Sequence, residues 1–199
     1  MRRAKAAIFG LFVVAVFPLV AAAWVEKRIS RSDQVFVFFA HLLALLPGLP
    51  GAYARGAYYF GTLDRCSWET NVGFGSLFTR RGGSVGRKAS IGCYCVLGHA
   101  DIGPGVMMGS RVSVPSGKRQ HLDAAGCLSA HEGSFDRVSV GGGSWIGEGS
   151  IILADIGPRC IVSAGAVVSR PMPAGSLVAG NPAKILRMVA SDALAHVED

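Results

Sequence analysis

An aliphatic residue returns about every six positions from Val85 to Val168, and the residue four places after it is nearly always small. The pairs are Val85 and Ala89, Ile91 and Cys95, Ile102 and Val106, Met108 and Val112, Val140 and Ser144, Ile146 and Ser150, Ile156 and Cys160, and Val162 and Ala166. Six is the period of a β-solenoid, in which a short strand and a tight turn repeat. Because a lone repeat cannot bury its apolar side chain, neighbouring coils must stack to form a core.

The end of this region carries more specific motifs. Ser144-Trp145-Ile146-Gly147 is followed by Ala164-Gly165-Ala166-Val167-Val168 and by the ending Ala179-Gly180-Asn181-Pro182-Ala183-Lys184. With these motifs the chain resembles the hexapeptide-repeat acyltransferases over roughly residues 46 to 187. The resemblance implies a mainly β chain folded as a left-handed parallel β-helix. It also implies an enzyme with acetyl-CoA as donor and a homotrimer whose cofactor groove lies between subunits.

The chain divides into three segments. We expect residues 1–63 to form membrane-associated helices and residues 64–182 to form the β-helix domain. A polar loop excursion, 115–137, interrupts the repeats, and binding or catalytic groups are often carried by such loops on a rigid scaffold. Residues 183–199 have helical composition and apolar spacing, so we expect a short C-terminal helix that caps the last coil.

The first segment contains an uncharged apolar run of 20 residues from Ala6 to Val25, flanked by basic residues. That length can span a bilayer, although a secretory signal is the alternative. A second run, Val35 to Leu46, is too short for a confident span and suits a hairpin, a re-entrant segment or an interfacial helix. The following stretch, 52–63, is rich in aromatic residues and contains Arg55. Such residues favour the headgroup level of a membrane, and a helix packed against the first coil is a compatible alternative.

Composition narrows the function classes. Half of the residues are hydrophobic and 27 are glycine, which is too apolar for a disordered chain. The net charge of +7 is concentrated near the N-terminus, where it suits anionic lipid headgroups. No aromatic-basic interleaving or recognition motif accompanies it, so we expect no nucleic-acid partner. The five cysteines show neither a disulfide framework nor zinc-type spacing.

The family's catalytic base is a histidine on a loop excursion, and His121 occupies that place here. A neutral imidazole can remove a hydroxyl proton as the oxygen attacks a thioester carbonyl. Asp123 is a candidate to orient the imidazole, with Glu132 as a rival, and His131 is a candidate either to line the acceptor site or to orient His121. Each of these side chains has a plain alternative as a solvated loop residue.

The resemblance also assigns the donor site. Trp145 would form a wall of the groove near the thioester, and Gly147, Ala164 and Ser169 would present backbone groups to the pantetheine amides. Arg170, Lys184 and Arg187 would face the phosphates or adenine. Glu148 departs from the family pattern, in which a small or polar residue often lies beside the cofactor. A carboxylate near a polyanion would be unfavourable, so we expect this side chain to point away from the cofactor.

The sequence thus predicts an acetyl-CoA-dependent O-acetyltransferase for a sugar hydroxyl of a glycan or polysaccharide precursor. Since acetyl-CoA is cytosolic, we expect the catalytic domain on the cytoplasmic side of the inner membrane. A zinc hydratase of the γ-carbonic anhydrase type is an alternative, but its spacing of three histidines is not evident, and we expect no metal site. A non-catalytic trimeric scaffold is the other alternative.

Overall fold

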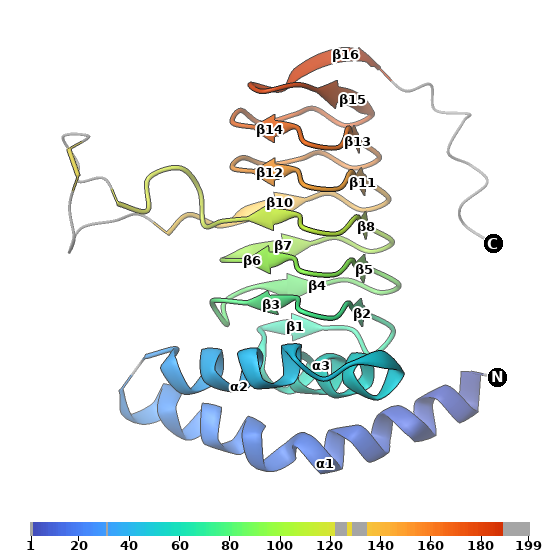
Figure 1. Cartoon of the computed structure of the whole chain (residues 1–199), viewed down its shortest axis with the longest axis vertical. Helices are drawn as coiled ribbons and strands as arrows, with labels where there is room; N and C mark the ends of the chain where they lie inside the picture. The colour runs from blue at the N-terminus through green and yellow to red at the C-terminus, as the bar shows by residue number, and fades with distance from the viewer. Residues whose placement is uncertain (1, 31, 122–126, 129–134, 189–199) are drawn as a thin grey trace.

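The computed structural model describes residues 2–30, 32–121, 127–128 and 135–188. Figure 1 shows a stack of coils that stands on a base of three helices. The stack is a parallel β-solenoid of about six turns, as the repeat predicts.

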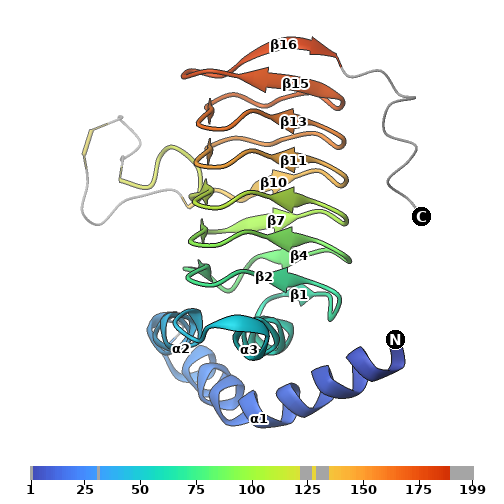
Figure 2. The same cartoon turned by 45° about the vertical axis from the view of Figure 1, so that its right-hand side comes forward.

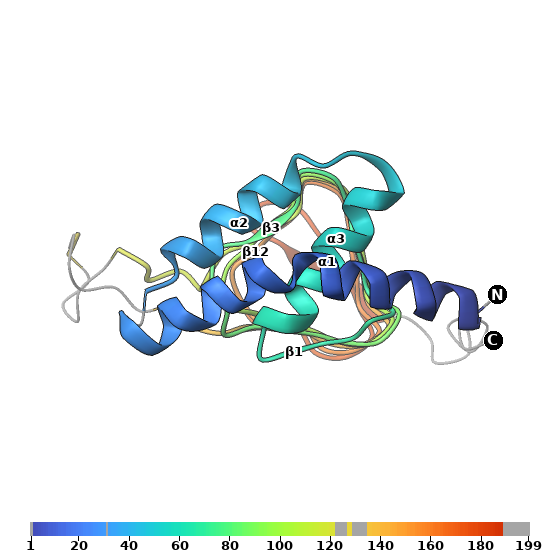
Figure 3. The ribbon, with the colours of Figure 1, turned by 90° about the horizontal axis from the view of Figure 1, so that it is seen from below.

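The base consists of α1 (Arg2–Ile29), α2 (Gln34–Ala44) and α3 (Gly48–Thr62). The α2 and α3 helices lie directly under the first coil, and α1 crosses beneath them, as the view from below shows (Figure 3). The α1 helix bends near its middle (Figure 2) and contains Pro18, whose ring and missing N–H disturb the helical ladder.

The strands form three sheets that run up the sides of the stack. Sheet A contains β1 (Arg65–Cys66), β4 (Ser84–Val85), β7 (Ala100–Ile102) and β10 (Val138–Val140). Sheet B contains β2 (Asn71–Val72), β5 (Ser90–Ile91), β8 (Met107–Met108), β11 (Trp145–Ile146), β13 (Ile161–Val162), β15 (Ser176–Ala179) and β16 (Lys184–Met188). Sheet C contains β3 (Leu77–Phe78), β6 (Val96–Leu97), β9 (Ser113–Val114), β12 (Ile151–Ile152) and β14 (Val167–Val168).

The core of the solenoid is built from the repeat positions. All eight predicted aliphatic residues and all eight small residues that follow them are buried. The small polar ones bind the backbone of the next coil. Ser144 Oγ, for example, donates to Gly157 O at 3.1 Å and accepts from Cys160 N at 3.0 Å. The interpretation of the repeat, with an aliphatic and a small residue pointing inward, is confirmed.

The prediction of a C-terminal helix is wrong for residues Lys184–Met188. These residues form β16, which pairs antiparallel with β15 across the turn at Gly180. The parallel ladder of sheet B would otherwise end in a row of unpaired backbone groups on β15, and a returning strand satisfies them where a helix would not. The predicted cap is therefore a strand in this part of the segment. The rest of the expected helix, residues 189–199, lies outside the described residues.

The lower end of the solenoid is closed by α3. Arg55 is 1% exposed, and its guanidinium donates to Val72 O in the first coil and to Leu43 O and Leu46 O of the α2 end. Tyr58 and Tyr59 are also buried. Packing against the first coil is therefore confirmed for these three residues, and a headgroup-level position, which is compatible with that packing, stays a prediction.

Candidate functional site

The loop excursion leaves the stack after β9 of sheet C and returns at β10 of sheet A. Its two stems are tied together by Ser116, a buried residue whose carbonyl accepts from Asp136 N at 3.1 Å. The Ser116 hydroxyl accepts from His99 N at 2.8 Å. Gly117 has a positive φ of 75°, and a Cβ there would lie 2.9 Å from the Asp136 side chain. The base of the excursion therefore has a defined geometry.

Arg137 fastens the returning stem to three coils. Its guanidinium donates to the Asp101 carboxylate at 3.0 and 3.2 Å, to Asp64 at 3.4 Å and to Gly82 O at 2.6 Å. It also lies 3.0 Å from His99 Nε2. The hydrogen bond to Asp101 is the main cause that raises the pKa of Arg137. Sequence reasoning missed this group, because its members come from separate coils and no sequence spacing links them.

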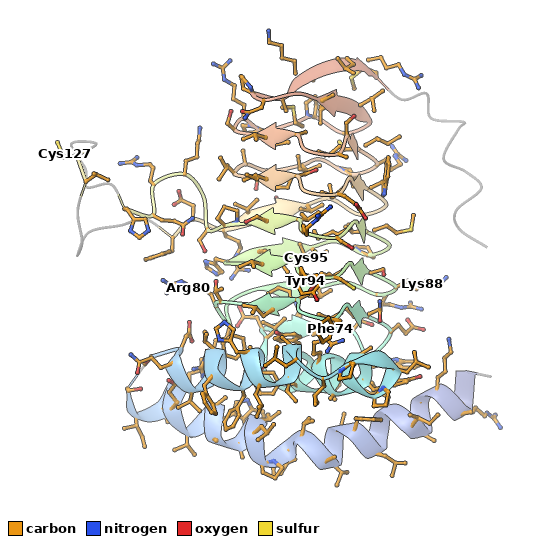
Figure 4. The ribbon with its side chains drawn as sticks, viewed as in Figure 1. Phe74, Arg80, Lys88, Tyr94, Cys95 and Cys127 are labelled. Atoms are coloured by element: carbon orange, nitrogen blue, oxygen red, sulfur yellow. The ribbon has the colours of Figure 1, made fainter. Side chains whose placement is uncertain are left out.

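A hollow of about 280 Å³ lies beside the stems of the excursion. Thr79 and Arg80 line it from the first coil, and Gln120 and Phe135 line it from the excursion. The Arg80 guanidinium lies over the Phe135 ring, 3.7 Å from its centroid. Figure 4 shows Arg80 on the side of the stack from which the excursion projects, with Cys127 farther out. The hollow offers hydroxyl, amide and guanidinium groups to a small polar molecule.

His121 directly follows Gln120 and is exposed. The structure thus places the predicted base next to a residue that lines the hollow. Asp123, Glu132 and His131 lie outside the described residues, so their proposed roles stay predictions.

Trp145 belongs to a different side of the stack. It lies on β11 of sheet B, points outward and is 49% exposed. In the register of this sheet Trp145 is next to Ile161, Ile161 is next to Leu177, and Leu177 is next to Arg187. Lys184 pairs with Ala179 on the same two last strands. Sheet B therefore carries the predicted aromatic wall and two predicted phosphate ligands on one side of the stack.

The corner after β11 is one of the places where the backbones of neighbouring coils approach closely. A Cβ at Gly147 would lie 2.4 Å from Ala164 N in the coil above, so stacking of the coils requires glycine there. Ala164 is exposed at the same corner. Glu148 lies between Gly147 and the next strand, and its exposed carboxylate is 3.8 Å from the Arg111 guanidinium of the coil below. The Glu148 side chain, which departs from the family pattern, is thus exposed to solvent, and its negative charge is partly neutralised by Arg111.

Ser169 and Arg170 are not brought to this side. They follow β14 of sheet C, at the corner from which the excursion leaves two coils below. One chain thus holds two separate groups. His121, Ser169 and Arg170 lie at the corner between sheets C and A, and Trp145, Lys184 and Arg187 lie on sheet B. Among the described residues, no three His, Cys, Asp or Glu side chains come together so as to hold a metal ion.

The fold is similar to that of known acetyltransferases. A maltose O-acetyltransferase from Clostridium difficile 630 matches with a TM-score of 0.64 and 21% identity over 80% of this chain and 87% of that one. A galactoside acetyltransferase in complex with coenzyme A matches with a TM-score of 0.58 and 15% identity over 80% of this chain and 82% of that one.

Sequence comparison agrees over a shorter stretch. A 2,3,4,5-tetrahydropyridine-2,6-dicarboxylate N-acetyltransferase of Staphylococcus aureus is 36% identical over 76 residues, which are 36% of this chain and 32% of the relative. The chain spans less than a third of the length of the curated relatives it matches. No protein-family model matches it. The chain has the β-solenoid fold of the hexapeptide-repeat acetyltransferases, and the two solved structures and the relative described above are named acetyltransferases.

Proposed function

We propose that this chain is an acetyl-CoA-dependent O-acetyltransferase that acts on a sugar hydroxyl of a glycan or polysaccharide precursor. The observation that carries the proposal is the line on sheet B that joins exposed Trp145 to Arg187 by strand register, beside the corner that carries Gly147 and exposed Ala164. The proposed donor is long and has an acyl end and a phosphate end. It would meet, one after another, an aromatic surface, a corner with little side-chain bulk and a cationic side chain.

The acceptor side of the proposal rests on His121 and the hollow. The His121 imidazole takes the proton of the sugar hydroxyl as its oxygen attacks the thioester carbonyl carbon. The carbon–sulfur bond then breaks, and the thiolate of CoA leaves and takes up the proton from the imidazolium. Backbone N–H groups near the corner would hold the oxyanion. The maltose and galactoside enzymes, and a polysialic-acid-specific acetyltransferase with a TM-score of 0.50, carry sugar acceptors in their names.

The proposed assembly is a homotrimer. His121 projects from the corner between sheets C and A, whereas Trp145 lies on sheet B of the same chain. Parallel copies placed side by side would let the excursion of one copy face sheet B of the next. The proposed site therefore needs two copies, and a monomer in light scattering that still turns over acetyl-CoA would contradict the assembly.

We also propose that the helical base associates with the inner membrane and that the solenoid faces the cytoplasm, where acetyl-CoA is available. The α1 helix is long and apolar enough to cross a membrane by length and composition. Its uncharged run and its basic flanks support the association.

The decisive test joins an assay in vitro to a comparison of cells. The full-length protein in detergent or nanodiscs is given acetyl-CoA and a panel of glycans, and mass spectrometry detects a gain of one acetyl group. The glycans of cells with and without the gene are compared in the same way. Release of CoA without acetylated glycan, or hydration of carbon dioxide that depends on zinc, would instead support a different enzyme. No catalysis at all in a protein that binds no acetyl-CoA would favour a scaffold.

A further inference from the structure

The outer face of α1 is apolar and has no protein partner among the described residues. Its exposed residues include Leu11 at 71%, Val14 at 74% and Phe17 at 56%. No charged residue occurs between Ala6 and Val25, so this face is free of charge over several turns. An exposed apolar surface of this extent marks a site that another apolar phase covers.

The opposite face of α1 is held against the rest of the structure from Phe9 to Glu26. Near the N-terminal end, Phe9 packs on Phe60 and Trp68, with ring centroids 5.6 and 6.3 Å apart. Val16 and Val20 are buried at its middle. Near the C-terminal end, Trp24 Nε1 donates to Gly61 O at 2.8 Å. A helix that crossed a bilayer with the solenoid outside would lose all but the contacts at one end.

A buried ionic cluster locks the C-terminal end of α1 to the solenoid. The Arg81 guanidinium donates to Glu26 and Asp33 at 2.5 and 2.6 Å, and to the carbonyls of Ala23 and Ser32. The Glu26 carboxylate also accepts from Val35 N and Phe36 N at the start of α2. This cluster joins α1, the start of α2 and the second half of the first coil, so α1 cannot swing away without leaving buried charges unpaired.

From this geometry we propose that the base binds one leaflet of a membrane with α1 lying in the plane of the leaflet, so that the solenoid axis stands along the membrane normal. Figures 1 and 3 show the arrangement that carries the proposal: α1 lies crosswise at the end of the stack, with its free face directed away from the coils. The inference deepens the proposed membrane association, on which it rests.

The basic residues at both ends of α1 favour a leaflet with anionic headgroups. Lys5 near the start of α1 and Lys27 and Arg28 near its end are exposed and flank the apolar face. A cavity of about 610 Å³ opens between α1, α3 and the first two coils, and Lys5 and Lys88 line it. Lysines at both ends of an in-plane helix would meet the negative headgroups while the apolar face enters the acyl boundary.

The orientation also fixes the height of the proposed donor site. Trp145 lies three strand steps above the first strand of sheet B, which is roughly 14 Å at the usual spacing between strands. Two helical layers add about 20 Å, so the tryptophan stands on the order of 30 Å above the lipid-facing side of α1. A lipid-linked acceptor must therefore carry several sugars between its anchor and the acetylated hydroxyl.

The first test is flotation of the full-length protein with vesicles of equal parts phosphatidylglycerol and phosphatidylcholine, compared with vesicles of phosphatidylcholine alone. We expect flotation with the anionic vesicles, a weaker signal with the neutral ones, and loss of flotation for the double variant Leu11→Glu, Phe17→Glu. The control is Leu128→Glu on the excursion, an exposed leucine outside the base that we expect to leave flotation unchanged. Undiminished flotation of the double variant would overturn the proposal, provided that its circular dichroism matches that of the parent.

The second test separates an in-plane helix from a spanning one. The variant Arg3→Cys in sealed vesicles is treated with a membrane-impermeant maleimide, and peptide mass spectrometry reads position 3 and Cys127 on the same molecules. We expect both positions to be labelled together or protected together. Labelling of one with protection of the other would show a span and overturn the in-plane orientation. Loss of acetyl transfer with unchanged flotation and labelling would contradict the proposed function and leave this inference standing.

Discussion

Trp145 and Arg187 lie on one line of the sheet B register, separated by Ile161 and Leu177. Both side chains are exposed, and strand spacing puts their Cα atoms roughly 14 Å apart. Because β16 returns antiparallel, an arginine that follows the last coil in sequence stands directly above the tryptophan of the fourth coil.

This alignment predicts that Arg187→Ala weakens acetyl-CoA binding more than acetyl transfer from the bound state. A phosphate contact made equally in the ground and transition states should raise KM about 5- to 50-fold and leave kcat nearly unchanged. The matched control is Arg159→Ala, which removes an exposed arginine from the corner between sheets A and B, two residues before Ile161 and outside the register line itself. A similar rise in KM for both variants would assign the effect to overall charge and not to this position.

The position of His121 predicts a loss of turnover without a loss of fold. His121→Ala removes a positioned base, which typically contributes about 10²- to 10⁴-fold in rate, and its side chain is exposed, so no cavity forms. Steady-state kinetics should show the drop in kcat, and the thermal midpoint should stay the same. The control His41→Ala removes an exposed histidine from α2. Near-normal turnover of His121→Ala would show that His121 is not the general base. Another group of the excursion would then be the candidate, and His131→Ala would be the next variant to test.

The cysteines should differ sharply in reactivity with a thiol reagent. Burial raises the pKa of Cys66 to about 12 and also raises the pKa of Cys95, so little thiolate forms at either position near neutral pH. Cys127 is exposed on the excursion. Timed alkylation followed by peptide mass spectrometry should modify Cys127 first and Cys66 and Cys95 only after unfolding. Fast modification of Cys66 in the folded protein would contradict the closed lower end of the solenoid.

The solenoid was predictable because each of its core positions is identified by residues that lie within a few positions of it in the sequence. Ile146 and its equivalents in the other coils all point inward, and the small residue four positions after each of them lies at a corner of the coil. The excursion was equally evident, since the period stops at Val114 and resumes before Val140. The last strand was not, because Ile185, Leu186 and Met188 suit a helix by local pattern, and the partner that imposes a strand is the unpaired edge of β15.

The candidate site was predictable only through the motifs of the resemblance. Motif spacing identified Trp145 and Gly147, but nothing in the sequence shows that Arg187 shares a register line with Trp145. The Arg137 group was missed for the same reason, since Asp64 and Asp101 approach it only through coil stacking. Contacts between side chains of different coils depend on the strand register. A shift of the register by one residue would change the neighbour of every outward-pointing side chain.

The buried cluster at Arg81 predicts a large loss of stability for Arg81→Ala. The side chains of Arg81 and Glu26 are each only 6% exposed, so Arg81→Ala leaves the Glu26 carboxylate buried without its cation. Removal of one partner of such a pair typically costs about 3–5 kcal/mol in the free energy of unfolding. Chemical denaturation in detergent micelles would measure the loss.

Arg87→Ala is the matched control for Arg81→Ala. Arg87 pairs with Glu69 at 3.0 Å, but its own side chain is 68% exposed, and exposed pairs contribute only about 0–1 kcal/mol. We therefore expect a clear gap in unfolding free energy between two variants that remove the same charge from the same coil region. The double variant Glu26→Gln, Arg81→Met should recover part of the stability, because it removes both charges of the buried pair. Equal stability of the two single variants would mean that the ionic cluster contributes little to holding α1 on the solenoid.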